Sequence, residues 1–108
     1  MYDSIKVKKR KTINDWMKLV KSIVLRNIDL DNYKVFLYGS RASQKYSHSS
    51  DIDIGIMVNR PIERGVIKKI NKELEETDIP YHIDIKDFFS VDEKFKEIAL
   101  KEIIIWNN

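Results

Sequence analysis

The residues with the clearest chemical potential lie between positions 39 and 53. Gly39 and Ser40 follow a short apolar run, and Asp51 and Asp53 come after a further ten residues. Because side chains alternate across a strand, Asp51 and Asp53 are expected to share one face. Two ionised carboxylates on one face repel each other unless a cation lies between them. The pattern therefore favours a divalent metal held by oxygen atoms, which indicates magnesium or manganese.

Gly39 and Ser40 suit a turn that binds phosphate. A glycine lets the backbone turn sharply and approach a ligand closely. Backbone N–H groups in such a turn can hold phosphate oxygens, and the Ser40 hydroxyl can donate one more hydrogen bond. Arg41 follows directly. Two roles are open for it, a contact with the nucleotide or a partner, and a position in solvent. Gly55 is expected on the carboxylate face, where the absence of a side chain leaves room.

Asp84 is a third candidate acid. It lies between Ile83 and Ile85 in another apolar segment. Carboxylates from two strands can hold two metal ions roughly 4 Å apart, one for a triphosphate and one that lowers the pKa of an incoming hydroxyl. His82 shares the face of Asp84 and is expected at the rim of the site.

The elements that position these residues follow from apolar spacing. They imply an α/β (α+β) fold, a small mixed sheet of about three strands flanked by helices, with a possible short C-terminal strand. Strand directions do not follow from the pattern. The expected elements are a helix over 13–27 capped by Thr12, strands over 33–38, 52–58 and 81–86, a helix from Pro61 to about Glu76, a last helix around 91–99 and an extended segment over 103–106.

Composition narrows the class of protein. With 108 residues, we expect a single domain over 1–108. The sequence has no cysteine, which excludes disulfides, Cys-ligated zinc and thiol catalysis. The net charge of +3 does not demand a nucleic acid, and the basic run over 6–11 is typical of a solvated chain end. No stretch is apolar enough for a signal peptide or a membrane span, so we expect a cytoplasmic protein without membrane contact.

At these residues the chain resembles the minimal nucleotidyltransferases of the DNA polymerase β-like superfamily, and in particular the MNT antitoxins paired with HEPN-domain toxins. Gly39-Ser40, the ten-residue spacing and Asp51-Ile52-Asp53 fit that signature, and Asp84 falls where the third acid is expected. Members often have a second glycine where this chain has Ser43 and Gln44. The resemblance implies a nucleotidyltransferase fold.

The resemblance also implies a reaction, the transfer of AMP from ATP to a tyrosine of a partner HEPN ribonuclease. Asp51 and Asp53 would coordinate magnesium, with manganese possible, and Asp84 would complete the site and help activate the tyrosine hydroxyl. Gly39, Ser40 and Arg41 would bind the nucleotide. The short length implies that another protein brings the acceptor.

Two other functions stay open. The chain can be an antitoxin that binds nucleotide and neutralises its toxin by occlusion, without transfer. It can also be a transferase that modifies nucleic acid, although the modest charge disfavours this. Asp84 favours the enzyme, because occlusion needs no third acid.

Overall fold

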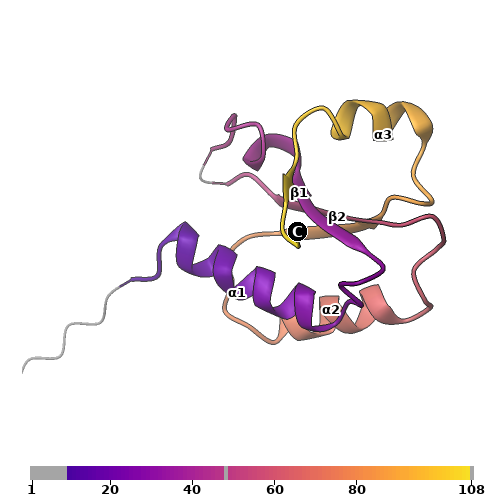
Figure 1. Ribbon diagram of the computed structural model, residues 1–108. Helices are drawn as coiled ribbons and strands as arrows, with labels where there is room; N and C mark the ends of the chain where they lie inside the picture. Colours follow the sequence, from indigo (N-terminus) through magenta and orange to yellow (C-terminus); the bar gives the residue numbers. More distant parts are fainter. Residues whose placement is uncertain (1–9, 48, 108) are drawn as a thin grey trace, which may run out of the picture.

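The computed structural model describes residues 10–47 and 49–107, so most of the basic run over 6–11 lies outside the described residues. Helices and strands alternate along the chain, as expected (Figure 1). In chain order the elements are α1 (Ile13–Arg26), β1 (Lys34–Tyr38), the 3-10 helix η2 (Gly39–Arg41), β2 (Ile52–Met57), α2 (Val66–Glu75), β3 (Ile83–Asp87), α3 (Glu93–Ala99) and β4 (Ile104–Ile105).

Helix α1 begins where its sequence signal predicts. The Thr12 hydroxyl accepts a hydrogen bond from the Asp15 backbone N–H at 3.3 Å, and the Asp15 carboxylate accepts one from the Thr12 N–H at 2.9 Å. This reciprocal capping box satisfies donors that a helix start otherwise leaves unpaired. The expected N-cap at Thr12 is confirmed.

Helix α2 is shorter than expected, and the prediction that it starts at Pro61 is wrong. Gly65, with φ of 92°, precedes its first residue in the left-handed region, which interrupts a right-handed helix. The Ile62 N–H donates to the Asp87 carboxylate at 3.2 Å. The segment from Pro61 to Gly65 is therefore a connection tied to the end of β3, and α2 begins only at Val66.

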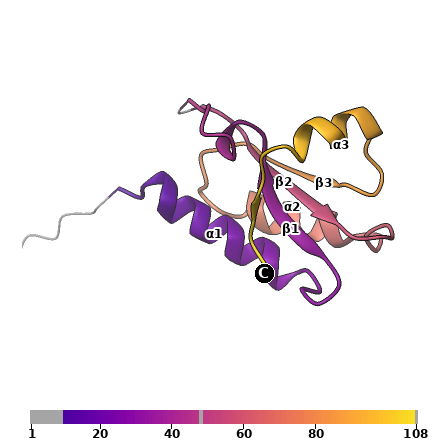
Figure 2. The same cartoon turned by 45° about the horizontal axis from the view of Figure 1, so that its top comes forward.

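The four strands form one mixed sheet in the order β3-β2-β1-β4. β1 is antiparallel to both β2 and β4, whereas β2 is parallel to β3. The extended segment expected over 103–106 thus supplies a short edge strand. Helices α1 and α2 cover one face of the sheet, and α3 lies over the other (Figures 1 and 2).

Strand alternation divides the apolar residues between two cores. The larger core lies between the sheet and α1 and α2, and includes Ile52, Ile54 and Ile56 of β2. A smaller aromatic core on the α3 face joins Phe36, Tyr38 and Phe88. The Phe88 ring lies edge-on to Phe36 at 4.9 Å and to Tyr38 at 5.0 Å, a favourable geometry for aromatic pairs. The residues of β2 between the three isoleucines therefore face α3.

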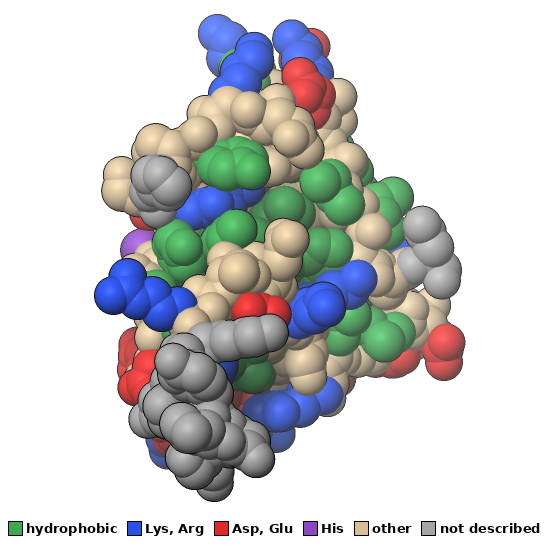
Figure 3. All heavy atoms as spheres, turned by 90° about the vertical axis from the view of Figure 1, so that its left-hand side faces the viewer, with side chains coloured by type: hydrophobic (Ala, Val, Ile, Leu, Met, Phe, Trp, Pro, Cys, Tyr) green, Lys and Arg blue, Asp and Glu red, His purple; other side chains and the backbone are tan. Residues whose placement is uncertain are grey.

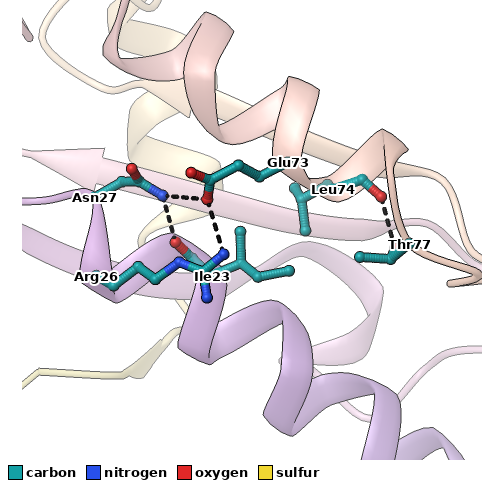
Figure 4. A network of polar contacts seen from close by, with 6 residues as sticks. All are labelled: Ile23, Arg26, Asn27, Glu73, Leu74 and Thr77. Carbon is teal, nitrogen blue, oxygen red and sulfur yellow. Dashed lines mark hydrogen bonds and ion pairs between the residues drawn. The ribbon is translucent and has the colours of Figure 1, made fainter.

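A polar network joins α1 and α2 beneath the sheet (Figure 4). The Glu73 carboxylate accepts hydrogen bonds from the Asn27 amide at 2.8 Å and from the Arg26 guanidinium at 3.1 Å. The Asn27 amide also donates to the Ile23 carbonyl at 2.8 Å, which ties the network to the end of α1. These contacts hold α1 against α2, so the two helices that cover one face of the sheet are joined to each other.

The surface is not uniformly polar. Seen from the side at which α1 begins (left in Figure 1), hydrophobic side chains lie exposed between lysine and arginine side chains (Figure 3). Within residues 10–47 and 49–107, no helix is long and apolar enough to cross a membrane.

Candidate active site

Parallel pairing of β2 with β3 brings two of the expected acids together. Asp53 lies directly opposite Asp84 in the register, and both line one cleft on the α3 face. Burial raises the pKa of the Asp53 carboxyl, and the neighbouring carboxylates of Asp84 and Asp51 raise it further. The fold thus places carboxylates together although burial and mutual repulsion disfavour the ionised form of Asp53. Carboxylate oxygens under such repulsion suit a divalent cation such as magnesium.

Asp51 stands apart from this pair. It is exposed and comes directly before the first residue of β2, and it is absent from the lining of the cleft. In the part of the chain that the structure describes, no three acidic or histidine side chains lie close enough together to hold a metal ion. His82 is exposed and does not line the cleft; it borders a separate pocket beside α2. The fold therefore gathers Asp53 and Asp84 and leaves Asp51 outside the lining of the cleft.

The Gly39 turn meets the Asp53 carboxylate. Gly39 has φ of 75°, and a Cβ atom added there would lie 2.5 Å from Oδ2 of Asp53. The N–H groups of Ala42 and Ser43 donate to the Gly39 carbonyl at 3.2 and 3.1 Å, and the Ser43 hydroxyl donates to the Ser40 carbonyl at 3.2 Å. Only glycine satisfies both the backbone angle and the close approach. The turn thus presents its backbone beside the acid.

Gly55 leaves room on the carboxylate face, as expected, and the aromatic core uses that room. A Cβ atom there would lie 2.4 Å from the ring of Phe36 and 2.8 Å from the ring of Phe88. The space above Gly55 is filled by the aromatic core. This glycine therefore makes room for packing beside the acids rather than for a ligand.

Arg41 is buried, with 5% of its surface exposed. Its Nε and Nη2 donate to the Ser50 carbonyl at 3.1 and 2.8 Å. The guanidinium lies over the rings of Tyr46 at 5.1 Å and Tyr81 at 4.8 Å. Arg41 therefore closes the loop that runs from the Gly39 turn to Asp51. The expectation that it contacts the nucleotide finds no support in this placement, since Arg41 does not line the cleft.

One cleft of about 500 Å³ connects the turn, the acids and α3. The sheet supplies one side, and α3 with the turn after it supplies the other. Its lining consists of Tyr38, Gly39, Ser43, Asp53, Asp84, Lys86, Phe95, Ile98, Ala99, Lys101 and Glu102.

Several of these lining residues were missed by reasoning from the sequence. A signal existed for Lys86, because it is two residues after Asp84 and strand alternation places both on one face. Ser43 follows the Gly39 turn closely enough to be suspected. Nothing in the local pattern indicates that Phe95 and Ile98 of α3 form the opposite wall, because that depends on how α3 packs on the sheet.

Tyr38 lies between the aromatic core and the acids. It pairs with Asp53 in the register of β1 and β2. Burial raises the pKa of the Tyr38 hydroxyl, and the carboxylates of Asp53 and Asp84 raise it further. The hydroxyl therefore stays protonated throughout the physiological range and adds no further negative charge to the cleft.

Comparison with known proteins agrees with this geometry. Residues 20–108 match the family described as "Polymerase beta, Nucleotidyltransferase". The chain is 27% identical over 89 residues to a probable protein adenylyltransferase MntA of Haemophilus influenzae, which covers 82% of this chain and 76% of that protein.

Two solved structures share the fold. One is a toxin–antitoxin crystal structure with AMP-PNP, which has a TM-score of 0.64 at 16% identity and covers 85% of this chain and 72% of that chain. The other is a mutant MntA–HpeT toxin–antitoxin, with a TM-score of 0.63 at 14% identity and coverage of 84% and 71%. The matched family segment contains the Gly39 turn and the acids Asp51, Asp53 and Asp84. The chain therefore belongs to the polymerase beta nucleotidyltransferase family.

Proposed function

We propose that this chain is an antitoxin that transfers AMP from ATP to a tyrosine of a HEPN-domain toxin in the cytoplasm. The observation that carries the proposal is the placement of Asp53 beside Asp84 in one cleft that the Gly39 turn also lines. A relative with 27% identity is named a probable protein adenylyltransferase, which supports a protein as the acceptor. A shared fold with a toxin–antitoxin crystallised with AMP-PNP supports ATP and a toxin as partners.

The Gly39 turn and the acids each have a role in this proposal. The backbone of the Gly39 turn binds the triphosphate, because N–H donors in a tight turn suit phosphate oxygens. Ser40 does not line the cleft but adjoins Gly39, and its hydroxyl is the further donor in this proposal. Asp53 and Asp84 would hold magnesium, and Asp51, which lies outside the lining of the cleft, would complete the ligand set. Bound magnesium would neutralise the triphosphate and lower the pKa of the incoming hydroxyl by a two-metal arrangement.

The transfer itself is a displacement at the α-phosphorus of ATP. The tyrosine oxygen of the toxin forms a bond to that phosphorus, and the bond from the phosphorus to the bridging oxygen of the β-phosphate breaks. Asp84 accepts the phenolic proton, and pyrophosphate leaves. The acid lies on the floor of the cleft opposite α3, where an incoming side chain can reach it.

The α3 wall supports a substrate with an apolar part. Phe95 and Ile98 line the cleft, although 38% and 63% of their respective surfaces are exposed. A ring that packs on them would cover these side chains and displace water from the acids. Removing water strengthens the electrostatic contacts on which phosphoryl transfer depends.

The intact mass of the toxin after incubation with this protein, ATP and magnesium tests the proposal. We expect a gain of ~329 Da for each AMP group transferred, a mass set by the chemistry of the group. Asp84→Asn should slow labelling by about two powers of ten or more, the scale of lost acid–base assistance. The exposed Asp78 lies outside the cleft, so Asp78→Asn is the matched control and should label at the wild-type rate.

The same measurement distinguishes the enzyme from an occluding antitoxin. If the wild type inhibits the toxin without adding mass under magnesium or manganese, occlusion replaces transfer as the function. If Asp84→Asn labels the toxin as fast as Asp78→Asn does, the role that we assign to Asp84 is wrong.

A further inference from the structure

Lys86 is a cleft residue to which the proposed reaction assigns no role. It lies two residues after Asp84 on β3, and its Nζ is 3.0 Å from Oδ2 of Asp84. Both side chains are 38% exposed, so the ion pair is open to solvent. The positive charge of Lys86 also offsets part of the rise in the pKa of Asp53 that burial and the neighbouring carboxylates cause. The ammonium therefore lies where the proposed metal would compete with it.

The sheet register shows what lies beside Lys86. Lys86 lies opposite Gly55 in the pairing of β2 with β3, so the neighbouring strand contributes no side chain at that position. The rings of Phe36 and Phe88 occupy the space directly above Gly55. Both rings are buried and do not line the cleft, and the ammonium of Lys86 pairs with Asp84 instead.

We propose that Lys86 is a built-in counter-cation that pairs with Asp84 before ligands bind and exchanges to the triphosphate when metal and nucleotide bind. This inference rests on the proposed function, because it requires metal at Asp84. Metal alone must break the ion pair and leave the ammonium without a partner. With ATP present, the displaced ammonium stays in the cleft that Gly39 and Ser43 line and pairs with a phosphate.

The consequence is a coupling between the two ligands. Metal binds weakly until nucleotide gives Lys86 a new partner, and nucleotide binds better when metal has freed Lys86. Such coupling is reciprocal by thermodynamic linkage. Lys86 is thus a positioning residue that keeps the acids from holding metal without substrate.

The test titrates manganese alone into the purified chain, followed by electron paramagnetic resonance. Lys86→Met should bind manganese about two- to fivefold more tightly than the wild type, the range that corresponds to losing a solvent-exposed ion pair. Lys86→Arg keeps the charge and should stay near the wild type. Lys101 lines the same cleft from beyond α3, so Lys101→Met is the control for net charge and should change affinity by less than about twofold.

The second measurement is calorimetry of ATP with saturating magnesium on the same variants. Here Lys86→Met should bind about two- to fivefold more weakly, because a phosphate loses its cation. A damaged fold would weaken the binding of both ligands. The exchange of Lys86 instead predicts tighter binding of manganese and weaker binding of ATP in the same variant. Lys86→Arg should restore the binding of magnesium-bound ATP.

Three outcomes overturn the inference. In the first two, Lys86→Met binds manganese with the same affinity as the wild type or as Lys101→Met. In the third, the affinities of Lys86→Met for manganese and for magnesium-bound ATP both rise or both fall. A different result overturns the proposed function together with the inference: if Asp84→Asn and the wild type bind manganese equally, no metal lies at Asp84.

Discussion

Gly39 and Gly65 offer a matched pair of substitutions that separates backbone strain from damage to the site. Both have a positive φ, 75° and 92°. A Cβ atom at Gly39 would lie 2.5 Å from Oδ2 of Asp53, whereas nothing lies within 4 Å of one at Gly65. Gly39→Ala and Gly65→Ala therefore share the backbone cost, and only the first displaces an acid of the cleft.

The magnitudes follow from these distances. A left-handed alanine costs about 1–2 kcal/mol, and a domain of this size loses about 4–8 °C in Tm for each kcal/mol. Both variants should therefore melt roughly 5–15 °C below the wild type. The Asp53 carboxylate is a side-chain end that can move aside, so the contact adds little to the loss of stability. A displacement of about 1 Å at a reacting centre can cost about a hundredfold in rate, so Gly39→Ala should lose that much transfer.

Two assays on each variant check this reasoning, a thermal melt in EDTA and calorimetry with ATP and magnesium. Gly65→Ala should bind as the wild type does, whereas Gly39→Ala should bind at least about tenfold more weakly. Transfer rates on the toxin should follow the same order. The reasoning is refuted if Gly39→Ala and Gly65→Ala bind ATP within twofold of each other, or if Gly65→Ala alone loses binding.

Further predictions concern the acids, the aromatic core, the buried arginine and the partner. The fold raises the pKa of Asp53, so the folded state binds the carboxyl proton more tightly than the unfolded state does. The free energy of unfolding therefore falls as pH rises from the ordinary carboxyl pKa through the raised one. Asp53→Asn should therefore melt above the wild type in EDTA at pH 7, with the difference closing below about pH 4. Gly55→Ala should cost about 1–3 kcal/mol in denaturant unfolding, since the new methyl group overlaps the aromatic rings. Arg41→Lys should also lose about 1–3 kcal/mol in denaturant unfolding. Lysine cannot make the paired hydrogen bonds to Ser50 and also stack on the tyrosine rings. Unchanged unfolding would show that the loop holds without these contacts. Co-expression with the HEPN toxin should yield a complex on size exclusion, and separate elution of the two proteins would count against the proposed partner.

Local pattern was sufficient for much of this protein. The capping signal at Thr12 and the apolar spacing after it predicted α1, since both depend on residues within a few positions of one another. Strand alternation predicted that Asp53 and Asp84 each have isoleucines on the opposite face. The short run after 102 was expected to be extended, and it forms β4. These features depend on periodicities of the backbone itself.

The sequence was less informative where a residue's role depends on a distant neighbour. The start of α2 was misplaced, because the hydrogen bond from Ile62 to Asp87 crosses 25 positions. The sequence predicts room at Gly55 but not what fills it, because Phe36 and Phe88 come from other parts of the chain. The sequence leaves the role of Arg41 open between a ligand contact and solvent, whereas the structure shows it buried and donating to the Ser50 carbonyl in the loop that it closes.

Only the tertiary structure decided how the acids meet. Side-chain alternation fixes the face on which an acid lies but not the strand beside it or the register between strands. The parallel pairing that sets Asp53 opposite Asp84, and the packing of α3 that encloses both in one cleft, arise from contacts between residues far apart in the chain. Burial of the two apolar faces of the sheet selects that arrangement, because it removes the most hydrophobic surface from water and no single segment can do so alone.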